Sequence, residues 1–215
     1  MTNPKDRFNR FSVPLGLLDY INPLFYTITM ATIIRNRYSI MPSPYNRILL
    51  AGAVISVFFG LIIPTGKVLV GLGIVKFRMP VSLVFCVNTG ILLSGLMLAK
   101  DIMNIPVPGL ILLIAVILAA LARIWSHSRK INTIAVLTGA AGYLLLYISL
   151  IALSLQKGTL VPIVLYALAI ALFVMLCGIG IKADLKNPKV HWVIEASNVL
   201  CQGLVAIATV VLFLR

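Results

Sequence analysis

Long apolar runs alternate with short polar segments along the whole chain, and this pattern predicts membrane-spanning helices. The hydrocarbon core of a bilayer is about 30 Å thick, so a helix needs about 20 mainly apolar residues to cross it. The runs are continuous rather than alternating at every second position, which argues against a β-barrel. We expect an all-α, polytopic transmembrane bundle forming a single domain over residues 1–215, with about seven spans at 13–34, 47–64, 80–99, 107–124, 132–155, 159–181 and 190–214.

One apolar stretch between the second and third predicted spans is too short to cross. It covers residues 68–75, and it is flanked by Pro64 on one side and by Lys76 on the other. A helix of about eight residues cannot cross the hydrocarbon core. We therefore expect residues 66–76 to form a re-entrant or interfacial segment or a loose turn, with Lys67 in the connection.

Composition agrees with a location in the membrane. The chain is 61% hydrophobic and 11% charged, with a mean hydropathy of +1.09, whereas a soluble domain carries roughly a quarter charged residues. The net charge of +13 does not predict nucleic-acid binding, because almost every Lys and Arg falls in a short loop or at a helix end. Membrane topology accounts for such a distribution. Anionic lipid headgroups are the partners that we expect for these basic loops.

The distribution of Lys and Arg also predicts an orientation. With seven spans, twelve of these residues fall on the N-terminal side and six on the other, and positive charge accumulates on the cytoplasmic side. We expect an integral protein of the plasma (inner) membrane, with a cytoplasmic N-terminus and an external C-terminus. Trp125 and Trp192 both fall at the predicted inner interface, where aromatic belts occur.

The last predicted span carries a polar stripe. His191, Glu195, Asn198 and Gln202 are spaced so that they share one face of a helix. Polar side chains at membrane depth are costly and normally face the interior of a bundle or a wet cavity. The stripe is therefore a candidate binding site.

Other odd-numbered spans carry similar polar positions. The first span contains Asp19, Asn22 and Tyr26, the third contains Asn88, and the fifth contains Tyr143. The even-numbered spans are almost wholly apolar. We expect spans one, three, five and seven to surround a polar interior, and spans two, four and six to pack mostly outside it.

Span two has a different pattern, of small residues. Gly52, Ser56 and Gly60 recur at every fourth position, and small residues at this spacing allow helices to approach closely in a membrane. Chance in a segment rich in small residues is the alternative.

Asp19 and Glu195 should lie at similar depth. With a rise of 1.5 Å per residue, Asp19 lies ~7 Å beyond Pro14 and Glu195 ~6 Å beyond His191, both from the inner side. No Lys or Arg lies in the interior of a predicted span to neutralise them. Either burial keeps the carboxyls protonated, or a cation from outside the chain sits between them. His191, one turn from Glu195, is a further proton-dependent partner.

Pro23 bears on the same site. It has no N–H to donate to the carbonyl of Asp19, so that oxygen is free beside a carboxylate and an amide. Such an arrangement suits a hard cation or an ammonium group. The alternative is a simple kink whose carbonyl is satisfied by a neighbouring helix.

Structural roles remain open for most of these residues. In a structural role, His191, which lies in the first turn of its helix, would only reach the headgroups. Asp19 and Glu195 would hold helices together, Asn88 and Gln202 would form interhelical hydrogen bonds, and Tyr143 would be an ordinary core aromatic.

Recognisable catalytic motifs are missing from the sequence. It contains no H-E-x-x-H, no G-x-S-x-G and no P-loop, each of which would indicate a known chemistry. Its three cysteines form no C-x-x-C pair, so we expect no metal or cofactor site. We assign no catalytic residue, and the sequence leans against an enzyme.

Three functions remain. The first is a transporter or channel for a proton, a cation or a small cationic solute, with Asp19 and Glu195 as the binding carboxylates. The second is a non-catalytic subunit or sensor module that works with a membrane partner. The third is a membrane-embedded enzyme that acts on a lipid or isoprenoid, with Glu195 or Asp19 as general acid or base.

Overall fold

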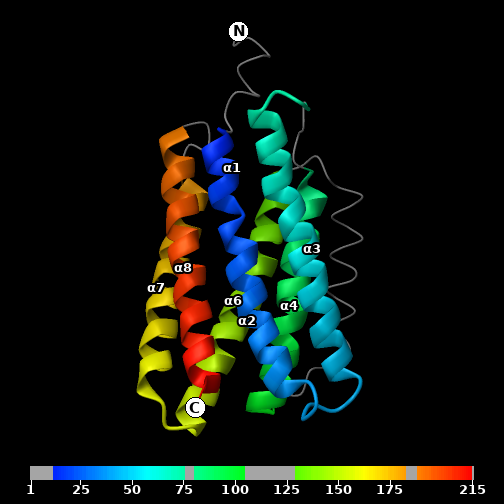
Figure 1. The fold of residues 1–215 in the computed structure, drawn as a ribbon, viewed down its shortest axis with the longest axis vertical. Coiled ribbons are helices and arrows are strands. Elements are labelled where there is room, and N and C mark those ends of the chain that lie inside the picture. Colours follow the sequence, from blue (N-terminus) through cyan, green and yellow to red (C-terminus); the bar gives the residue numbers. More distant parts are fainter. Residues whose placement is uncertain (1–11, 76–79, 105–128, 183–187, 215) are drawn as a thin grey trace.

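A bundle of helices lies side by side along one long axis (Figure 1). The computed structural model describes residues 12–75, 80–104, 129–182 and 188–214, and every regular element within these residues is a helix. The helices are α1 (Val13–Asp19), α2 (Ile21–Arg37), α3 (Tyr45–Gly71), α4 (Val81–Met103), α6 (Arg129–Gln156), α7 (Leu160–Lys182) and α8 (Pro188–Leu214).

Five helical stretches within the described residues are long and apolar enough to cross a membrane. They are Val13–Arg37, Tyr45–Gly71, Ser82–Met103, Leu137–Gln156 and Lys189–Leu214, and α7 adds the shorter apolar helix Leu160–Leu176. These helices indicate an integral membrane protein built as a helical bundle. The predicted span at 107–124 and Trp125 lie outside the described residues, so the count of seven spans stays a prediction.

The first predicted span is one apolar stretch broken at Tyr20. Ser12 begins α1 by accepting a hydrogen bond from the Leu15 N–H at 3.4 Å. At the break, the Tyr20 N–H donates to the carbonyl of Leu17 at 3.2 Å, three residues back instead of four. Pro23 follows and cannot donate to the carbonyl of Asp19. The regular helical hydrogen bonding is thus interrupted between α1 and α2, three residues before Pro23.

Helix α3 continues through the segment that was expected to leave the bundle. The prediction of a re-entrant or interfacial piece beginning at residue 66 is wrong, because α3 is helical to Gly71 and contains Pro64 in its interior. A membrane helix tolerates proline where its surroundings satisfy the freed backbone groups. The consequence is that Lys67 lies inside a span.

Small residues bring α3 and α4 into close contact, as their spacing predicted. A Cβ atom added to Gly52 would lie 2.7 Å from the carbonyl oxygen of Gly90. The Ser56 hydroxyl donates to the carbonyl of Val87 at 3.1 Å. Gly60 differs, because it faces Pro23 of α2, where an added Cβ would make an ordinary contact at 3.5 Å.

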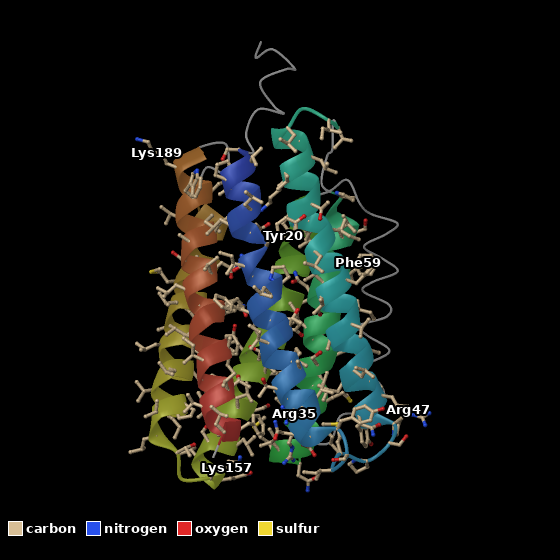
Figure 2. All side chains as sticks on the ribbon, viewed as in Figure 1. Tyr20, Arg35, Arg47, Phe59, Lys157 and Lys189 are labelled. Atoms are coloured by element: carbon tan, nitrogen blue, oxygen red, sulfur yellow. The ribbon has the colours of Figure 1, made fainter. Side chains whose placement is uncertain are left out.

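Charged side chains lie at the two ends of the bundle. Arg35, Arg47 and Lys157 lie at one end and Lys189 at the other (Figure 2). At the first of these ends, Arg37 forms an ion pair with Asp101 of α4, with its Nε 2.8 Å from Oδ2. Asp101 falls within the last turn of α4 because that helix is longer than predicted.

Candidate functional site

Three charged side chains from three helices meet inside the bundle. The Lys67 Nζ atom of α3 lies 2.8 Å from Asp19 Oδ2 of α1 and 2.6 Å from Glu195 Oε1 of α8. All three residues are buried, with exposed fractions of 7% for Lys67, 8% for Asp19 and 8% for Glu195. We call Asp19, Lys67 and Glu195 the ion cluster. It joins the two acids that the sequence placed at similar depth.

The expectation that no Lys or Arg lies inside a span is wrong. Lys67 sits inside α3 because that helix continues past Pro64. The start of α1, the end of α3 and the start of α8 lie at the same end of the bundle (Figure 1), so the three cluster residues lie about one to two turns in from that end. The cation between the two carboxylates is thus a side chain of the protein itself.

Asn22 ties the two carboxylates together from the other side. Its Nδ2 donates to Asp19 Oδ1 at 3.2 Å and lies 3.4 Å from Glu195 Oε2. Its carbonyl oxygen Oδ1 is buried and has no hydrogen-bond partner among the described residues. A buried acceptor without a donor is costly, so Asn22 offers an oxygen ready for a ligand.

A glycine sets the distance between α1 and α3. A Cβ atom on Gly16 would lie 2.8 Å from Val68 Cγ2 and 3.0 Å from the backbone nitrogen of Val68. Only a residue without a side chain lets α1 pack so close to the α3 backbone beside Lys67. The Tyr20 hydroxyl adds a hydrogen bond of 2.6 Å to Thr65 Oγ1. These contacts hold Asp19 against Lys67.

Helix α8 approaches in a similar way. Gly203 faces the ring of Phe25 on α2, where an added Cβ would lie 3.2 Å from the ring. The absence of a side chain at Gly203 allows α2 and α8 to pack closely. Glu195, two turns earlier on α8, is thereby kept within reach of Asn22.

A cavity of about 290 Å³ begins at the ion cluster. Asp19 belongs to both features, because its side chain is part of the ion cluster and also lines the cavity. One water occupies about 30 Å³ in the liquid, so the cavity has room for several waters or for a small organic molecule. The polar residues predicted for the site that line it are Asp19, Asn22, Tyr26, Asn88, Tyr143 and Asn198.

A second polar group without a partner lines this cavity. The Tyr26 hydroxyl is buried and makes no hydrogen bond among the described residues, and Tyr26 as a whole is 4% exposed. The hydroxyls of Ser56 and Ser94 are its polar neighbours; each donates to a backbone carbonyl and keeps lone pairs that can accept from the Tyr26 O–H. The Tyr26 hydroxyl can therefore turn either to these serines or to a ligand or a water in the cavity.

Aromatic rings from three helices form another part of the wall. The rings of Tyr26 on α2 and Tyr143 on α6 have centroids 6.4 Å apart and are inclined at 85°. Phe173 on α7 lies with its centroid 5.3 Å from that of Tyr143, at 55°. All three residues line the cavity.

The positions of three further predicted residues relative to the cavity differ. Asn88 lines it and donates its Nδ2 to the carbonyl of Ala135 at 2.7 Å. Gln202 is 2% exposed and donates to the Tyr147 hydroxyl at 3.2 Å, which is an interhelical hydrogen bond of the kind considered above. His191 is half-buried, one turn before Glu195 on α8. Neither Gln202 nor His191 is among the described lining residues.

The expectation that even-numbered spans pack mostly outside the polar interior is wrong for α3. Helix α3 contributes Ser56 and Gly60 to the cavity and Lys67 to the ion cluster, and α7 contributes Phe173. Of these, Ser56 and Gly60 carried a signal for close helix packing, and Lys67 carried one as a charge only three residues beyond a predicted span. Phe173 carried none, because a phenylalanine in an apolar helix is typical of any membrane span.

The atoms at the site that could bind a cation are oxygens, and the Lys67 ammonium already contacts two of them. Among the described residues no three His, Cys, Asp or Glu side chains form a group with the arrangement of a metal site. With all three groups of the ion cluster ionised, two negative charges face one positive charge. One further proton or cation would make it neutral.

Comparisons with protein-family models, with curated protein sequences and with solved structures find no match to this chain.

Proposed function

We propose that this protein is a membrane transporter or channel for a proton, a cation or a small cationic solute, and that the ion cluster is its binding site. The observation that carries the proposal is the position of Lys67 between two buried carboxylates at 2.8 and 2.6 Å, beside a cavity that shares Asp19. The site residues are Asp19, Lys67 and Glu195, with Asn22 as the neutral oxygen donor.

The charge of the ion cluster supports this role. Burial of an uncompensated charge in a low-dielectric interior is expensive, and proteins avoid it by pairing or by proton binding. Two carboxylates and one ammonium leave a single negative charge uncompensated. A proton or a second cation is the group that neutralises it, and only one of them is needed. Binding of one therefore opposes binding of the other, which is a coupling between two ligands.

Lys67 gives the site a cation that can move. A lysine ammonium is a compact charge on a flexible four-carbon chain, and here it contacts both acids. A cation that arrives in the cavity meets Asp19 first, because Asp19 lines the cavity and Glu195 does not among the described residues. The ammonium of Lys67 can then stay with Glu195 while the new cation takes the side of Asp19. The unpartnered Asn22 oxygen supplies a further contact.

We place this site in a seven-span protein of the inner membrane, with a cytoplasmic N-terminus and basic loops against anionic headgroups. The position of Lys67 inside α3 removes one charge from the N-terminal side. Eleven Lys and Arg remain there against six on the other side, so the charge bias still favours this orientation. The ion cluster then lies in the inner half of the bilayer.

Ion flux through the purified protein tests the proposal. Proteoliposomes are exposed to gradients of H⁺, Na⁺, K⁺, methylammonium and choline; a trapped pH-sensitive dye follows H⁺, and the uptake of each other cation is measured directly. We expect flux of at least one of these ions with the wild-type protein, and its loss in both Asp19→Asn and Glu195→Gln. Asp101→Asn is the matched control, because it removes a carboxylate from an ion pair at the far end of the bundle. Full flux in the Asp19→Asn, Glu195→Gln double variant would overturn the proposal.

A further inference from the structure

The walls of the cavity differ from those of a site for a bare metal ion. Na⁺, K⁺ and divalent ions bind where several oxygens converge on one point. Here the carboxylate oxygens are engaged by Lys67 and Asn22, and much of the lining is carbon, from residues such as Ile63, Val84 and Ile91. The space is also far wider than one ion.

Aromatic rings next to a negative charge are the walls that suit an organic cation. The face of an aromatic ring attracts a cation that lies within about 6 Å of its centroid, and aromatic cages bind alkylated ammonium groups. Tyr26, Tyr143 and Phe173 come from three different helices, and their inclined rings share the cavity. Asp19 lies two helical turns before Tyr26 in sequence, about 10 Å along the helix axis.

Two buried polar atoms without hydrogen-bond partners belong to residues that line the cavity. Asn22 Oδ1 is an acceptor, and the Tyr26 hydroxyl can donate or accept; both are buried without hydrogen-bond partners among the described residues. Asn22 is 9% exposed and Tyr26 4%, and both line the cavity. A ligand with a hydroxyl or N–H group near its charge would satisfy them.

We infer that the cavity binds a small alkylated ammonium ion, with its charged nitrogen between Asp19 and the rings of Tyr26 and Tyr143. The alkyl groups lie against Phe173 and the aliphatic wall, and a polar substituent reaches Asn22 Oδ1 or the Tyr26 hydroxyl. This inference rests on the proposed function, for which it names the class of solute.

Paired ligands of equal shape test the inference in purified protein. Choline and its neutral isostere 3,3-dimethylbutan-1-ol differ only in charge, so their binding, measured by calorimetry, isolates the cation contribution. We expect choline to bind at least about 10-fold more tightly than the neutral isostere, because cation–π and carboxylate attraction are each worth about one decade or more. Equal binding of the two would overturn the inference.

Variants locate the binding in the cavity. Tyr143→Leu should weaken choline binding about 10-fold or more, and Tyr143→Phe should keep it, because the ring remains. Phe58→Leu is the matched control, since Phe58 on α3 is 60% exposed and outside the described lining. If Tyr143→Leu fails to fold, Tyr143→Phe and Asp19→Asn still test the inference. Loss of choline binding in Tyr143→Phe would contradict it, and so would unchanged choline binding in Asp19→Asn.

The same measurements separate this inference from the proposed function. Binding or flux of H⁺, Na⁺ or K⁺ that depends on Asp19 and Glu195, without choline binding, would overturn the inference and leave the proposed function standing. If the protein shows no choline binding and no ion flux, both the inference and the proposed function are overturned. Choline binding lost in Asp19→Asn but kept in Asp101→Asn would support both.

Discussion

Lys67 is the residue on which the ion cluster depends most. It is the only positive charge within 4 Å of Asp19 and Glu195 among the described residues, and it contacts both. Buried ion pairs contribute little net stability compared with apolar residues of the same shape, but removal of one partner leaves an uncompensated charge. The effect of a substitution therefore depends on which partner is removed.

Lys67→Met should destabilise the protein by about 3–5 kcal/mol, because two carboxylates would then face each other in the interior without a cation. The loss should shrink as the pH falls. A proton on one of the acids relieves the repulsion in the folded state, so the folded variant binds more protons than the unfolded chain and gains stability at low pH. Thermal unfolding in detergent at two pH values measures this.

Lys157→Met is the control for that prediction. Lys157 is exposed and donates to the carbonyl of Leu212 at the end of the bundle, so its loss should cost less than about 1 kcal/mol. Adding Asp19→Asn to Lys67→Met should recover part of the lost stability, since one of the two opposed charges disappears. Equal effects of Lys67→Met and Lys157→Met would contradict the burial of the ion cluster.

The polar residues of the site were more predictable than its cation. Asp19, Asn22, Tyr26, Asn88, Tyr143 and Asn198 interrupt apolar helices, and helical periodicity with the cost of polar groups in lipid is enough to direct them to a common interior. Lys67 was missed because Pro64 and Gly66 resemble the end of a helix. The binding roles of the polar site residues stay predictions that the flux and calorimetry experiments test.

At the scale of the elements, proline and glycine determine where the cluster residues meet. Pro23 ends the regular hydrogen bonding after Asp19 and separates α1 from α2. Pro64 leaves α3 unbroken, since a helix inside a membrane loses more by exposing its backbone than by accommodating one missing N–H. Identical residue types therefore have opposite effects, which depend on surroundings that local sequence does not reveal.

Gly16→Ala should separate α1 from α3. The added Cβ would lie 2.8 Å from Val68 Cγ2 and 3.0 Å from Val68 N, so the helices must move apart and lengthen the contact between Asp19 and Lys67. We expect a loss of about 1–3 kcal/mol, together with loss of ion flux. Thermal unfolding and the flux assay measure the two effects.

Gly60→Ala gives the matched comparison for stability. Its added Cβ would make only an ordinary contact of 3.5 Å with Pro23, and alanine is favoured over glycine in a helix by up to about 1 kcal/mol. Stability should therefore be unchanged or slightly higher. If Gly16→Ala is as stable as Gly60→Ala, the close approach of α1 and α3 does not hold.

At the scale of the whole molecule, the described charges divide between the ends of the bundle and one internal cluster. The apolar helix surfaces and the class of fold followed from hydropathy alone, because lipid admits few alternatives to closed helical bundles. The neighbours of each helix did not follow from it. An apolar face is equally suited to lipid and to another helix, so α3 was placed outside the interior in error.

The orientation of the molecule can be tested by cysteine labelling from outside intact cells. A cysteine at Ser39, between α2 and α3, should react with a membrane-impermeant maleimide, and a cysteine at Asn3 should react only after the membrane is permeabilised. This result is expected because the positive charge bias places the N-terminus inside. The reverse labelling pattern would show that the ion cluster lies in the outer half of the bilayer.

The central claim is that a proton and a cation compete to neutralise one uncompensated negative charge in the ion cluster. Proton release on cation binding measures this competition most directly. Choline and Na⁺ are added to the purified protein in weakly buffered detergent with a pH indicator. We predict that the wild type releases up to one proton per cation bound, with weaker binding at lower pH, and that Asp19→Asn and Glu195→Gln release none. Cation binding by the wild type without proton release, or release by both variants equal to that of the wild type, would contradict the account.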